Sequence, residues 1–425
     1  MRTEPAQPSD LAKGDRVHRD IYLDEQVFRD ELERIFYTTW VYVGHESEVR
    51  QIGDFKTTHI GLQPVIVSRH DDNAIYVMLN RCTHRAATVC QEQSGNTRVF
   101  RCGYHGWLFR RNGELLQPTL DSGYDKRDFN KSDFTLGRAP RVDLYRGMIF
   151  ASLASEGPSL REHLGKAADY IDLAFDIAPD GDVHLSAGRQ LYTYAGNWKL
   201  QCENVVDGYH TNFVHKSFLE VTGIPELTGL FNANSKGRAG DLGGGHGVLD
   251  SRAGLQPMYA ESLKTAQGKR DLEALTERLG DRERAEYVLM SGGTNGFNLV
   301  VFPNVLMVAH QIRVVHPRTV HSTDVEMYPY LLGGASAATN AARLRTHEEF
   351  YGAAGAGGPD DVEMFRRVFE GLSAKGVPAV EWLHFARGLR RTVVEDGVEF
   401  GHATDEHPQR GFYRQWLRMM EAADR

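Results

Sequence analysis

Residues 80–107 hold two Cys/His pairs, and this pattern constrains the fold of the chain more than any other feature. Cys82 and His84 form a Cys-x-His pair, and Cys102 and His105 form a Cys-x-x-His pair after a gap of seventeen residues. Thiolates and imidazoles are metal ligands, and four of them at this spacing can converge on one site. The stretch therefore predicts a metal site.

β-rich runs surround both pairs. Residues 64–80 consist of two such runs around an Asp-Asp-Asn turn, and residues 97–116 repeat the pattern with Asn112-Gly113 as the turn dipeptide. A further run over 146–153 is typical of a closing strand. We expect residues 40–155 to form a small all-β domain that carries both Cys/His pairs at hairpin tips.

Zinc and a Rieske [2Fe–2S] cluster both accept two cysteines and two histidines. Zinc modules usually group their ligands as a Cys-Cys pair and a His-His pair, whereas each pair here mixes one Cys with one His. In a Rieske cluster one iron binds both thiolates and the other binds both imidazoles, which two mixed hairpin tips supply. Tyr104 and Trp107 are apolar enough to shield such a cluster. We favour the Rieske cluster, with all four residues as its ligands.

A second candidate metal site lies in "CENVVDGYHTNFVH" (202–215), which contains Asp207, His210 and His215. On a regular helix the two histidine side chains, five residues apart, would point about 140° away from each other. For both imidazoles to bind one ion, the helix must widen, bulge or end between them. Taken alone, this spacing favours one buried and one surface histidine over a metal site.

The second site nevertheless has the composition of a known iron centre. Two histidines and one carboxylate form the facial triad of non-haem Fe(II) oxygenases, which leaves positions open for dioxygen. The carboxylate would come from elsewhere in the chain. "GPDDVEMFRR" places Asp360 and Asp361 at the start of a helix predicted over 359–372, where an aspartate can instead act as an N-cap.

The remainder of the chain mixes helical and β-rich patterns. Residues 1–39 carry an amphipathic helix, and residues 156–425 include β-rich runs over 297–332. Residues 221–295 are expected to mix Gly-rich loop with charged helix. We expect 1–39 to pack with 156–425 as one α+β domain, with the all-β domain inserted between them.

The chain resembles the large (α) subunits of Rieske non-haem iron aromatic-ring-hydroxylating oxygenases. The motif "EN-x-x-D-x-Y-H-x4-H" from Glu203 to His215 carries the resemblance together with the two Cys/His pairs, and it extends to "RGFYRQW" (410–416). Two departures are visible. Ala86 stands where the family's "CxHRG" would have Gly, and Gly103 stands where Pro is frequent.

The resemblance implies a fold and a set of site residues. The fold is α+β, with an all-β Rieske domain inserted into a catalytic domain built from an antiparallel sheet with helices, similar to a helix grip. The implied ligands of a mononuclear Fe(II) are His210, His215 and Asp361, with Asp361 favoured over Asp360 by its place before the helix. Asp207 and Asn204 are implied catalytic residues. The family's matching aspartate links the catalytic histidine, here His210, to a Rieske histidine of the neighbouring subunit.

The resemblance also implies an activity and partners. The chain would be a terminal oxygenase that receives electrons from an NAD(P)H-linked reductase, sometimes through a ferredoxin, and inserts both atoms of O2 into an aromatic ring. No Gly-x-Gly-x-x-Gly fingerprint follows a strand, so NAD(P)H is expected to bind a separate protein. The implied assembly is an α3 trimer, or α3β3 with a small β subunit.

Within the family, the opening segment from Arg16 to Val49 and "HQIRV" (310–314) look most like the benzoate, anthranilate and salicylate branch. Arg313 is then a candidate clamp for a substrate carboxylate, because a guanidinium pairs with it through two hydrogen bonds. Alternatively, Arg313 faces solvent or a neighbouring subunit. Val206 and Phe213 are expected either to line the substrate pocket or to belong to the core.

Two other functions share parts of this pattern. A Rieske electron carrier needs only the first domain, and the roughly 270 further residues with a facial triad argue against it. A homotrimeric Rieske monooxygenase or demethylase would contain both sites and stays the alternative to a dioxygenase.

Composition limits the partners and the compartment. The net charge of −8 gives no reason to expect nucleic acid or an anionic membrane as a partner. Four cysteines make no disulfide framework, and the N-terminus has no apolar signal segment, so we expect a cytoplasmic protein.

Overall fold

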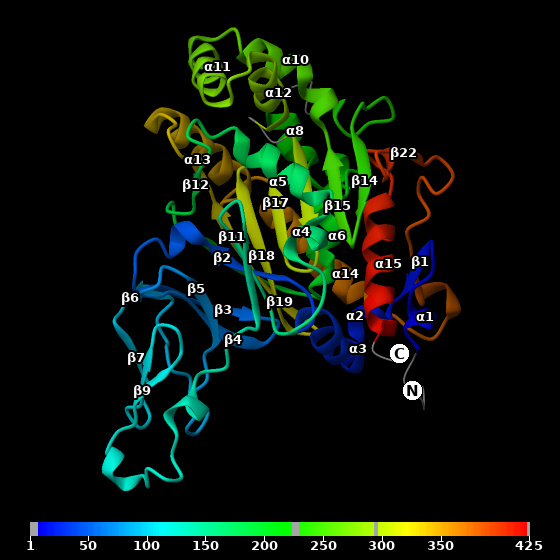
Figure 1. Cartoon of the computed structure of the whole chain (residues 1–425). Helices are drawn as coiled ribbons and strands as arrows, with labels where there is room; N and C mark the ends of the chain where they lie inside the picture. The colour runs from blue at the N-terminus through cyan, green and yellow to red at the C-terminus, as the bar shows by residue number, and fades with distance from the viewer. Residues whose placement is uncertain (1–6, 223–228, 293–295, 423–425) are drawn as a thin grey trace. The chain divides into compact units, whose positions relative to one another are not determined.

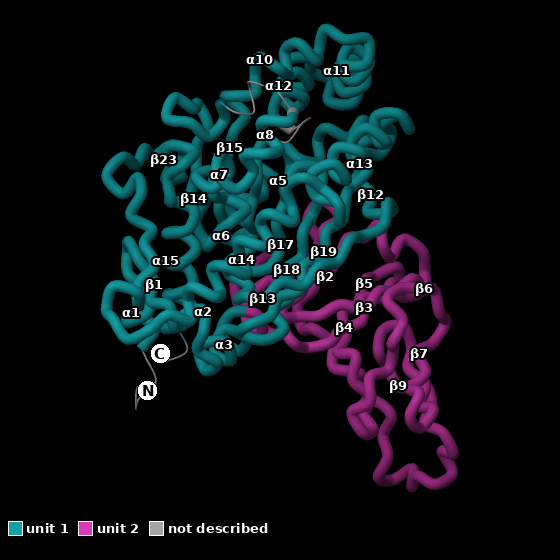
Figure 2. The backbone as a smooth tube through the Cα atoms, turned by 180° about the vertical axis from the view of Figure 1, so that it is seen from behind, with its two compact units in different colours: residues 1–35, 161–425 teal, residues 36–160 magenta. Residues whose placement is uncertain are grey.

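The computed structural model of the chain describes residues 7–222, 229–292 and 296–422. The chain forms two compact units, one from residues 1–35 and 161–425 (unit 1) and the other from residues 36–160 (unit 2) (Figure 2). Unit 2 is therefore inserted into the sequence of unit 1. Among the described residues, no helix combines the length and apolar character needed to cross a lipid bilayer.

Unit 2 consists of three antiparallel sheets. Their strand orders are β10-β11-β2, β5-β4-β3-β6 and β7-β8-β9. The strands are β2 (Val41–His45), β3 (Asp54–Ile60), β4 (Gln63–Arg69), β5 (Ile75–Leu79), β6 (Ser94–Asn96), β7 (Val99–Arg101), β8 (Leu108–Arg110), β9 (Leu115–Gln117), β10 (Arg141–Tyr145) and β11 (Met148–Ser152). A core that includes Phe55, Ile66, Phe100 and Phe109 also encloses Cys82 and Cys102.

The region predicted as one hairpin over 97–116 contains three strands and two turns. The first turn, between β7 and β8, carries Cys102 and His105, and the second joins β8 to β9 through Asn112-Gly113. Gly113 has a φ of +88°, which glycine adopts without the steric cost of a side chain. The turn dipeptide was therefore predicted correctly, and the Cys/His tip is a second hairpin beside it.

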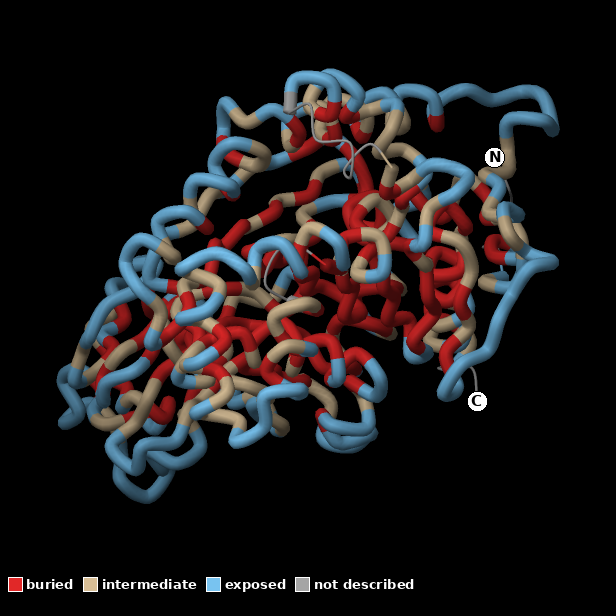
Figure 3. The backbone as a smooth tube through the Cα atoms, turned by 90° about the horizontal axis from the view of Figure 1, so that it is seen from above, coloured by how far each residue is buried: buried red, intermediate tan, exposed pale blue. Residues whose placement is uncertain are grey.

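Unit 1 is built on a nine-stranded antiparallel sheet in the order β13-β19-β18-β17-β16-β15-β14-β23-β22 (Figure 1). Its strands are β13 (Gln190–Ala195), β14 (Arg238–Gly243), β15 (His246–Asp250), β16 (Phe297–Val301), β17 (Val305–Val308), β18 (Gln311–Thr319), β19 (Ser322–Pro329), β22 (Val393–Glu395) and β23 (Val398–His402). Buried residues gather along the central strands (Figure 3), and all of β17 is buried.

Helices pack against this sheet and position the functional residues. α15 (His407–Ala422) contacts β14 and β15, and α14 (Gly358–Leu372) contacts β13. α6 (Lys199–Val205) contacts β16 and β17, and α13 (Ala337–Tyr351) contacts β20 (Leu331–Leu332). Between β15 and β16 the chain inserts a helical layer of α10 (Arg252–Ser262), α11 (Ala266–Leu279) and α12 (Arg282–Gly292) (Figure 1).

The N-terminal helical part packs into unit 1 through a buried carboxylate. Glu31, at the end of α3 (Glu25–Glu31), pairs with Lys199 at 2.6 Å, and both side chains are fully buried. The indole N–H groups of Trp198 and Trp416 donate to the same carboxylate at 2.8 and 2.7 Å. Since a buried ion pair is stable only when its remaining hydrogen-bonding capacity is used, this network fixes α3, α6 and α15 together.

Two sequence expectations need correction. The amphipathic helix expected within residues 1–39 is divided, because Asp24 caps α3 and residues Leu32–Phe36 form a π-helical segment. The Gly-rich stretch 240–247 lies in a region expected to be loop and helix, but it forms the end of β14 and the start of β15. Gly240 lies so close to the Phe400 ring that a Cβ there would come within 2.5 Å of it, so this glycine serves close packing within the sheet. Gly243, Gly244 and Gly245 have positive φ values where β14 turns into β15.

Candidate active site

The two Cys/His pairs lie on two loops with the same hydrogen bonding. The Cys82 N–H donates to Ala87 O at 2.8 Å, and the Ala86 N–H donates to Cys82 O at 2.9 Å. In the second loop, the Cys102 N–H donates to Trp107 O and the Gly106 N–H donates to Cys102 O, both at 2.9 Å. Ala86 and Gly106 occupy the matching position and have φ values of +63° and +74°. Each loop thus holds its Cys and His side chains on one side of a tight turn.

The two imidazoles of this site lie edge to face, with 73° between their planes. The ring centroids of His84 and His105 are 4.6 Å apart, and Trp107 stacks on His84 at 4.7 Å with 10° between the planes. Trp107 is buried, as expected for a shielding residue, whereas Tyr104 is 62% exposed and leans over His105. Three further rings surround Trp107: Tyr124, Phe129 and Phe134.

These residues fit a cluster with separate thiolate and imidazole ends. Cys82 and Cys102 are buried, and burial together with the neighbouring Cys102 raises the pKa of the Cys82 thiol. Bound metal cations supply the positive charge that deprotonates such thiols. The Nδ1 atom of His84 is buried and has no hydrogen-bond partner within the described ranges, so it is available as a ligand.

The second site is formed where helix α7 (Thr211–Val214) begins and ends. His210 precedes α7 and His215 follows it, so the regular helix ends before His215, as the five-residue spacing required. Asp361 reaches the same point from the first turn of α14. Its Oδ1 atom lies 3.2 Å from His215 Nε2 and 3.6 Å from His210 Nε2.

This group has the geometry of a metal centre. One ligand atom from each of His210, His215 and Asp361 lies within 4.8 Å of the others. Burial opposes ionisation of the Asp361 carboxyl, but the two imidazoles outweigh it and lower its pKa. Two imidazoles and one carboxylate are the ligand set of a non-haem iron centre with open positions. The structure places Asp361, and not Asp360, at this point.

Asn204 and Asp207 lie around the His210 ring. The Asn204 Nδ2–H donates to Asp361 Oδ1 at 3.1 Å and lies 3.3 Å from His210 Nε2. Asp207 Oδ2 lies 3.5 Å from His210 Nδ1, the nitrogen that faces away from Asp361, and Asp207 Oδ1 accepts from the Tyr209 N–H at 2.5 Å. Although burial disfavours a charged imidazole, Asp207 outweighs it and raises the pKa of His210. Asp207 therefore lies beside the His210 ring and outside the group formed by His210, His215 and Asp361.

A cavity of about 330 Å³ opens beside Asp361. Neighbouring strands β13, β19 and β18 supply one wall, because Gln190 pairs in register with Met327 and Met327 with Arg313. The other wall comes from the end of α13 and the start of α14. The lining residues are Gln190, Leu191, Tyr192, Arg313, Met327, Tyr351, Gly352, Ala353, Gly358, Pro359, Asp361 and Val362.

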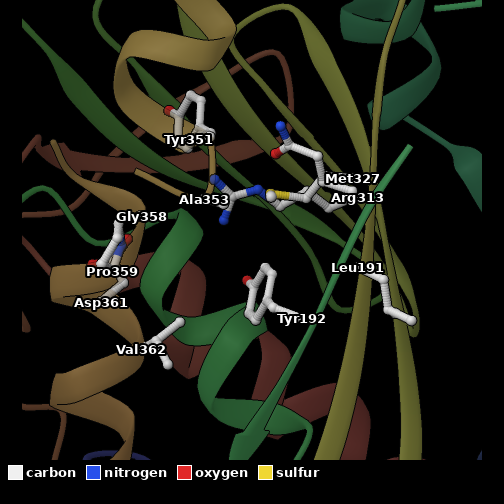
Figure 4. Close-up of a pocket in the computed structure, with 12 residues that line it drawn as sticks. Leu191, Tyr192, Arg313, Met327, Tyr351, Ala353, Gly358, Pro359, Asp361 and Val362 are labelled. Atoms are coloured by element: carbon white, nitrogen blue, oxygen red, sulfur yellow. The ribbon is translucent and has the colours of Figure 1, made fainter. Parts of the chain in front are cut away.

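Arg313 is the one basic side chain that lines this cavity. It is 3% exposed, its guanidinium lies 4.7 Å from the centre of the Tyr351 ring, and Figure 4 shows it between Tyr351 and Tyr192. Burial raises the pKa of both Tyr192 and Tyr351 to about 12, so both phenols stay neutral. Within the described ranges the Arg313 Nε–H has no hydrogen-bond partner.

The structure separates the other predicted pocket residues from this cavity. Val206 is buried against Cys202, Gly247 and Phe412, and Phe213 is 74% exposed. Tyr192, Met327 and Tyr351 were not predicted as pocket residues, because they meet only through strand register and through the position at which α13 ends. The alternation of Tyr192 and Tyr194 along β13 was the one available signal. It shows that the two rings lie on the same side of the strand, but it does not show what that side contacts.

Comparisons with known proteins agree with both sites. Residues 176–422 match the family described as "Ring hydroxylating alpha subunit (catalytic domain)", and residues 39–123 match "Rieske [2Fe-2S] domain". The chain is 31% identical to the 2-halobenzoate 1,2-dioxygenase large subunit of Burkholderia cepacia, over 88% of this chain and 80% of that protein. It is 32% identical to the anthranilate 1,2-dioxygenase large subunit of Acinetobacter baylyi, over 88% and 81%.

Solved structures show the same arrangement of the fold. The naphthalene 1,2-dioxygenase of Rhodococcus sp. bound to indole superposes with a TM-score of 0.82 at 26% identity, over 96% of this chain and 95% of that one. A second naphthalene 1,2-dioxygenase structure with indole in the active site gives 0.84, also at 26% identity, over 97% and 94%.

Proposed function

Because this chain belongs to the family of Rieske ring-hydroxylating dioxygenase α subunits, we propose that it dihydroxylates the ring of an aromatic carboxylate. The family accounts for the oxidoreductase class, for the Rieske [2Fe–2S] domain and for the His-His-Asp group typical of a mononuclear iron site. Family membership does not identify the substrate, and the aromatic acid is our proposal.

One observation carries the choice of substrate. Arg313 presents a buried guanidinium to the same cavity as Asp361, and Asp361 is the one acidic residue among the described residues that line it. A buried guanidinium without a counter-ion is costly, and an aromatic carboxylate would supply the counter-ion through two charge-assisted hydrogen bonds. The relatives named for 2-halobenzoate and anthranilate act on aromatic acids, which supports the same choice.

The residues of the site would have separate roles in the reaction. Iron held by His210, His215 and Asp361 would supply the activation of dioxygen. Arg313 would hold the carboxylate and so fix which ring carbons point toward Asp361. The rings of Tyr192 and Tyr351 and the Met327 side chain would enclose the aromatic ring and exclude water, while Asn204 keeps the Asp361 carboxylate turned toward the histidines.

Electrons would reach this site from outside the chain. Cys82, His84, Cys102 and His105 would hold the Rieske cluster, which passes on one electron at a time. We propose an NAD(P)H-linked reductase as the donor, with or without a ferredoxin, and an α3 or α3β3 assembly. In that assembly Asp207 would link His210 to His105 of the partner subunit.

The substrate proposal is tested by replacing Arg313 with Gln. We expect kcat/KM for benzoate to fall at least about thirty-fold, equivalent to about 2 kcal/mol, while the value for toluene stays within about threefold. Arg318→Gln is the matched control, since Arg318 lies on the same strand but pairs with Asp324. Equal losses for benzoate and toluene would contradict the clamp. Product analysis under labelled O2 separates a dioxygenase, with two labelled atoms in the product, from a monooxygenase with one.

A further inference from the structure

A second group of cationic and polar side chains is buried in unit 1 near Arg313. Arg343 and His347 lie on α13 at positions i and i+4, so they share one face of the helix with Tyr351. Arg343 is 7% exposed and His347 is 1% exposed. His310, in the turn between β17 and β18, is also buried, and its carbonyl accepts from the N–H of Tyr330, whose ring lies 4.9 Å from the Arg343 guanidinium. Burial lowers the pKa of His310, and Arg343 and His347 act in the same direction.

The polar atoms of this group are poorly satisfied. Arg343 Nε and Nη2, both ring nitrogens of His347 and Nδ1 of His310 are buried without a hydrogen-bond partner among the residues that the structure describes. Folded proteins rarely leave such atoms unpaired, so these five atoms on Arg343, His347 and His310 indicate a missing binding partner.

The positive charge of Arg343 has no carboxylate partner within the described part of the chain. Glu348 follows His347 in the sequence and acts against burial on the pKa of His347, but it is exposed and accepts two hydrogen bonds from Gln190. The aromatic ring of Tyr330 lies 4.9 Å from the Arg343 guanidinium and offers a weak cation–π contact. Burial lowers the pKa of Arg343 and of both histidines.

Water alone does not resolve this arrangement. Water molecules could satisfy the unpaired N–H groups, but they cannot neutralise a guanidinium, which stays protonated even when it is buried. A bound anion would do both. Its ligands would be the Arg343 fork and one nitrogen of each imidazole, which is a typical donor set for a carboxylate.

We propose that Arg343, His347 and His310 form a buried anion subsite that takes a carboxylate group. The subsite lies next to the substrate cavity, because His347 precedes Tyr351, which lines that cavity, by one turn on the same face of α13. The carboxylate can be a second acidic group on the aromatic substrate, and this source rests on the proposed function. It can also be a small free acid, and this source is independent of the proposed function.

The test uses the iron-loaded holoenzyme and measures equilibrium binding by calorimetry. The probes are benzoate, the three benzenedicarboxylates and sodium acetate, each with the wild type, Arg343→Gln and Arg343→Lys. Arg345→Gln is the matched control, since Arg345 lies on the same helix but is exposed. Circular dichroism and iron content are recorded for every variant, so that a variant that fails to fold is recognised. If Arg343→Gln fails to fold, Arg343→Lys is compared with the wild type in its place.

Two outcomes support the subsite. At least one dicarboxylate binds about tenfold more tightly than benzoate, and Arg343→Gln removes this preference while benzoate binding stays within about twofold. Alternatively, acetate alone binds the wild type and not Arg343→Gln, which identifies a free acid as the source. Equal binding of all probes by the wild type and Arg343→Gln would overturn the proposal. Loss of benzoate binding in Arg313→Gln reports on the proposed function separately.

Discussion

At the scale of single residues, the clearest irregularity is the backbone of Ala86 in the first Cys/His loop. Its φ of +63° is a left-handed conformation that costs a residue with a Cβ about 1–2 kcal/mol. The second loop has Gly106 at the matching position, where a Cβ would lie 2.7 Å from Thr119 Oγ1. The departure from the family's glycine at position 86 therefore stores strain beside the proposed cluster.

We expect Ala86→Gly to stabilise unit 2 by about 0.5–1 kcal/mol, because relief of the strain exceeds the greater freedom of glycine in the unfolded chain. The measurement is thermal unfolding followed by the visible absorbance of the cluster. Gly106→Ala is the opposite control and should lower the midpoint. An unchanged or lower midpoint in Ala86→Gly would show that the loop is not strained.

At the scale of elements, Glu203 joins three helices of unit 1. The hydroxyl of Tyr22 on α2 (Asp20–Leu23) donates to the Glu203 carboxylate at 2.8 Å, and that of Tyr413 on α15 donates to the same oxygen. Burial raises the pKa of Glu203 to about 7, although the two hydroxyls oppose the shift. The folded unit thus favours the protonated carboxyl, while the unfolded chain ionises near pH 4.3.

This shift predicts a pH dependence with a definite sign. A carboxyl with a raised pKa contributes its full stability below the unfolded pKa and loses it as the pH rises through the folded pKa, by about 3–4 kcal/mol. In Glu203→Gln that loss should be absent, so the difference in unfolding free energy between variant and wild type should grow from pH 4.5 to 7 and then stay constant. Urea unfolding at a series of pH values measures it, with the exposed Glu33→Gln as control. A difference that does not change with pH would contradict the prediction.

The elements also show how far the sequence could lead. The Cys/His loops and the break before His215 were predictable because each depends on residues within a few positions of one another. The strands β14 and β15 were missed because glycines that serve close packing look like loop glycines in a sequence. The wall of the cavity was missed because Tyr192, Met327 and Arg313 meet only through the register of three strands.

At the scale of the whole molecule, the role of Asp207 depends on assembly. If Asp207 links His210 to His105 of the partner subunit, Asp207→Ala should leave iron in both sites but slow electron transfer between them at least about tenfold. Single-turnover oxidation of the reduced cluster with substrate and O2 measures the transfer, and iron analysis measures the loading. Asp360→Ala is the control, because Asp360 lies outside the ligand group. Normal transfer would refute the link, and loss of the mononuclear iron alone would make Asp207 a ligand.

The insertion of unit 2 has a consequence for synthesis on the ribosome. Unit 2 is contiguous, so all its strands are available once residue 160 has emerged. Unit 1 must wait much longer, because Glu31 and Tyr22 find their partners Trp416 and Tyr413 only when α15 has been made. During that interval α2 and α3 lack the helix that covers them. The nascent chain therefore carries the complete sequence of unit 2 between a short first part and a long second part of an unfinished unit 1.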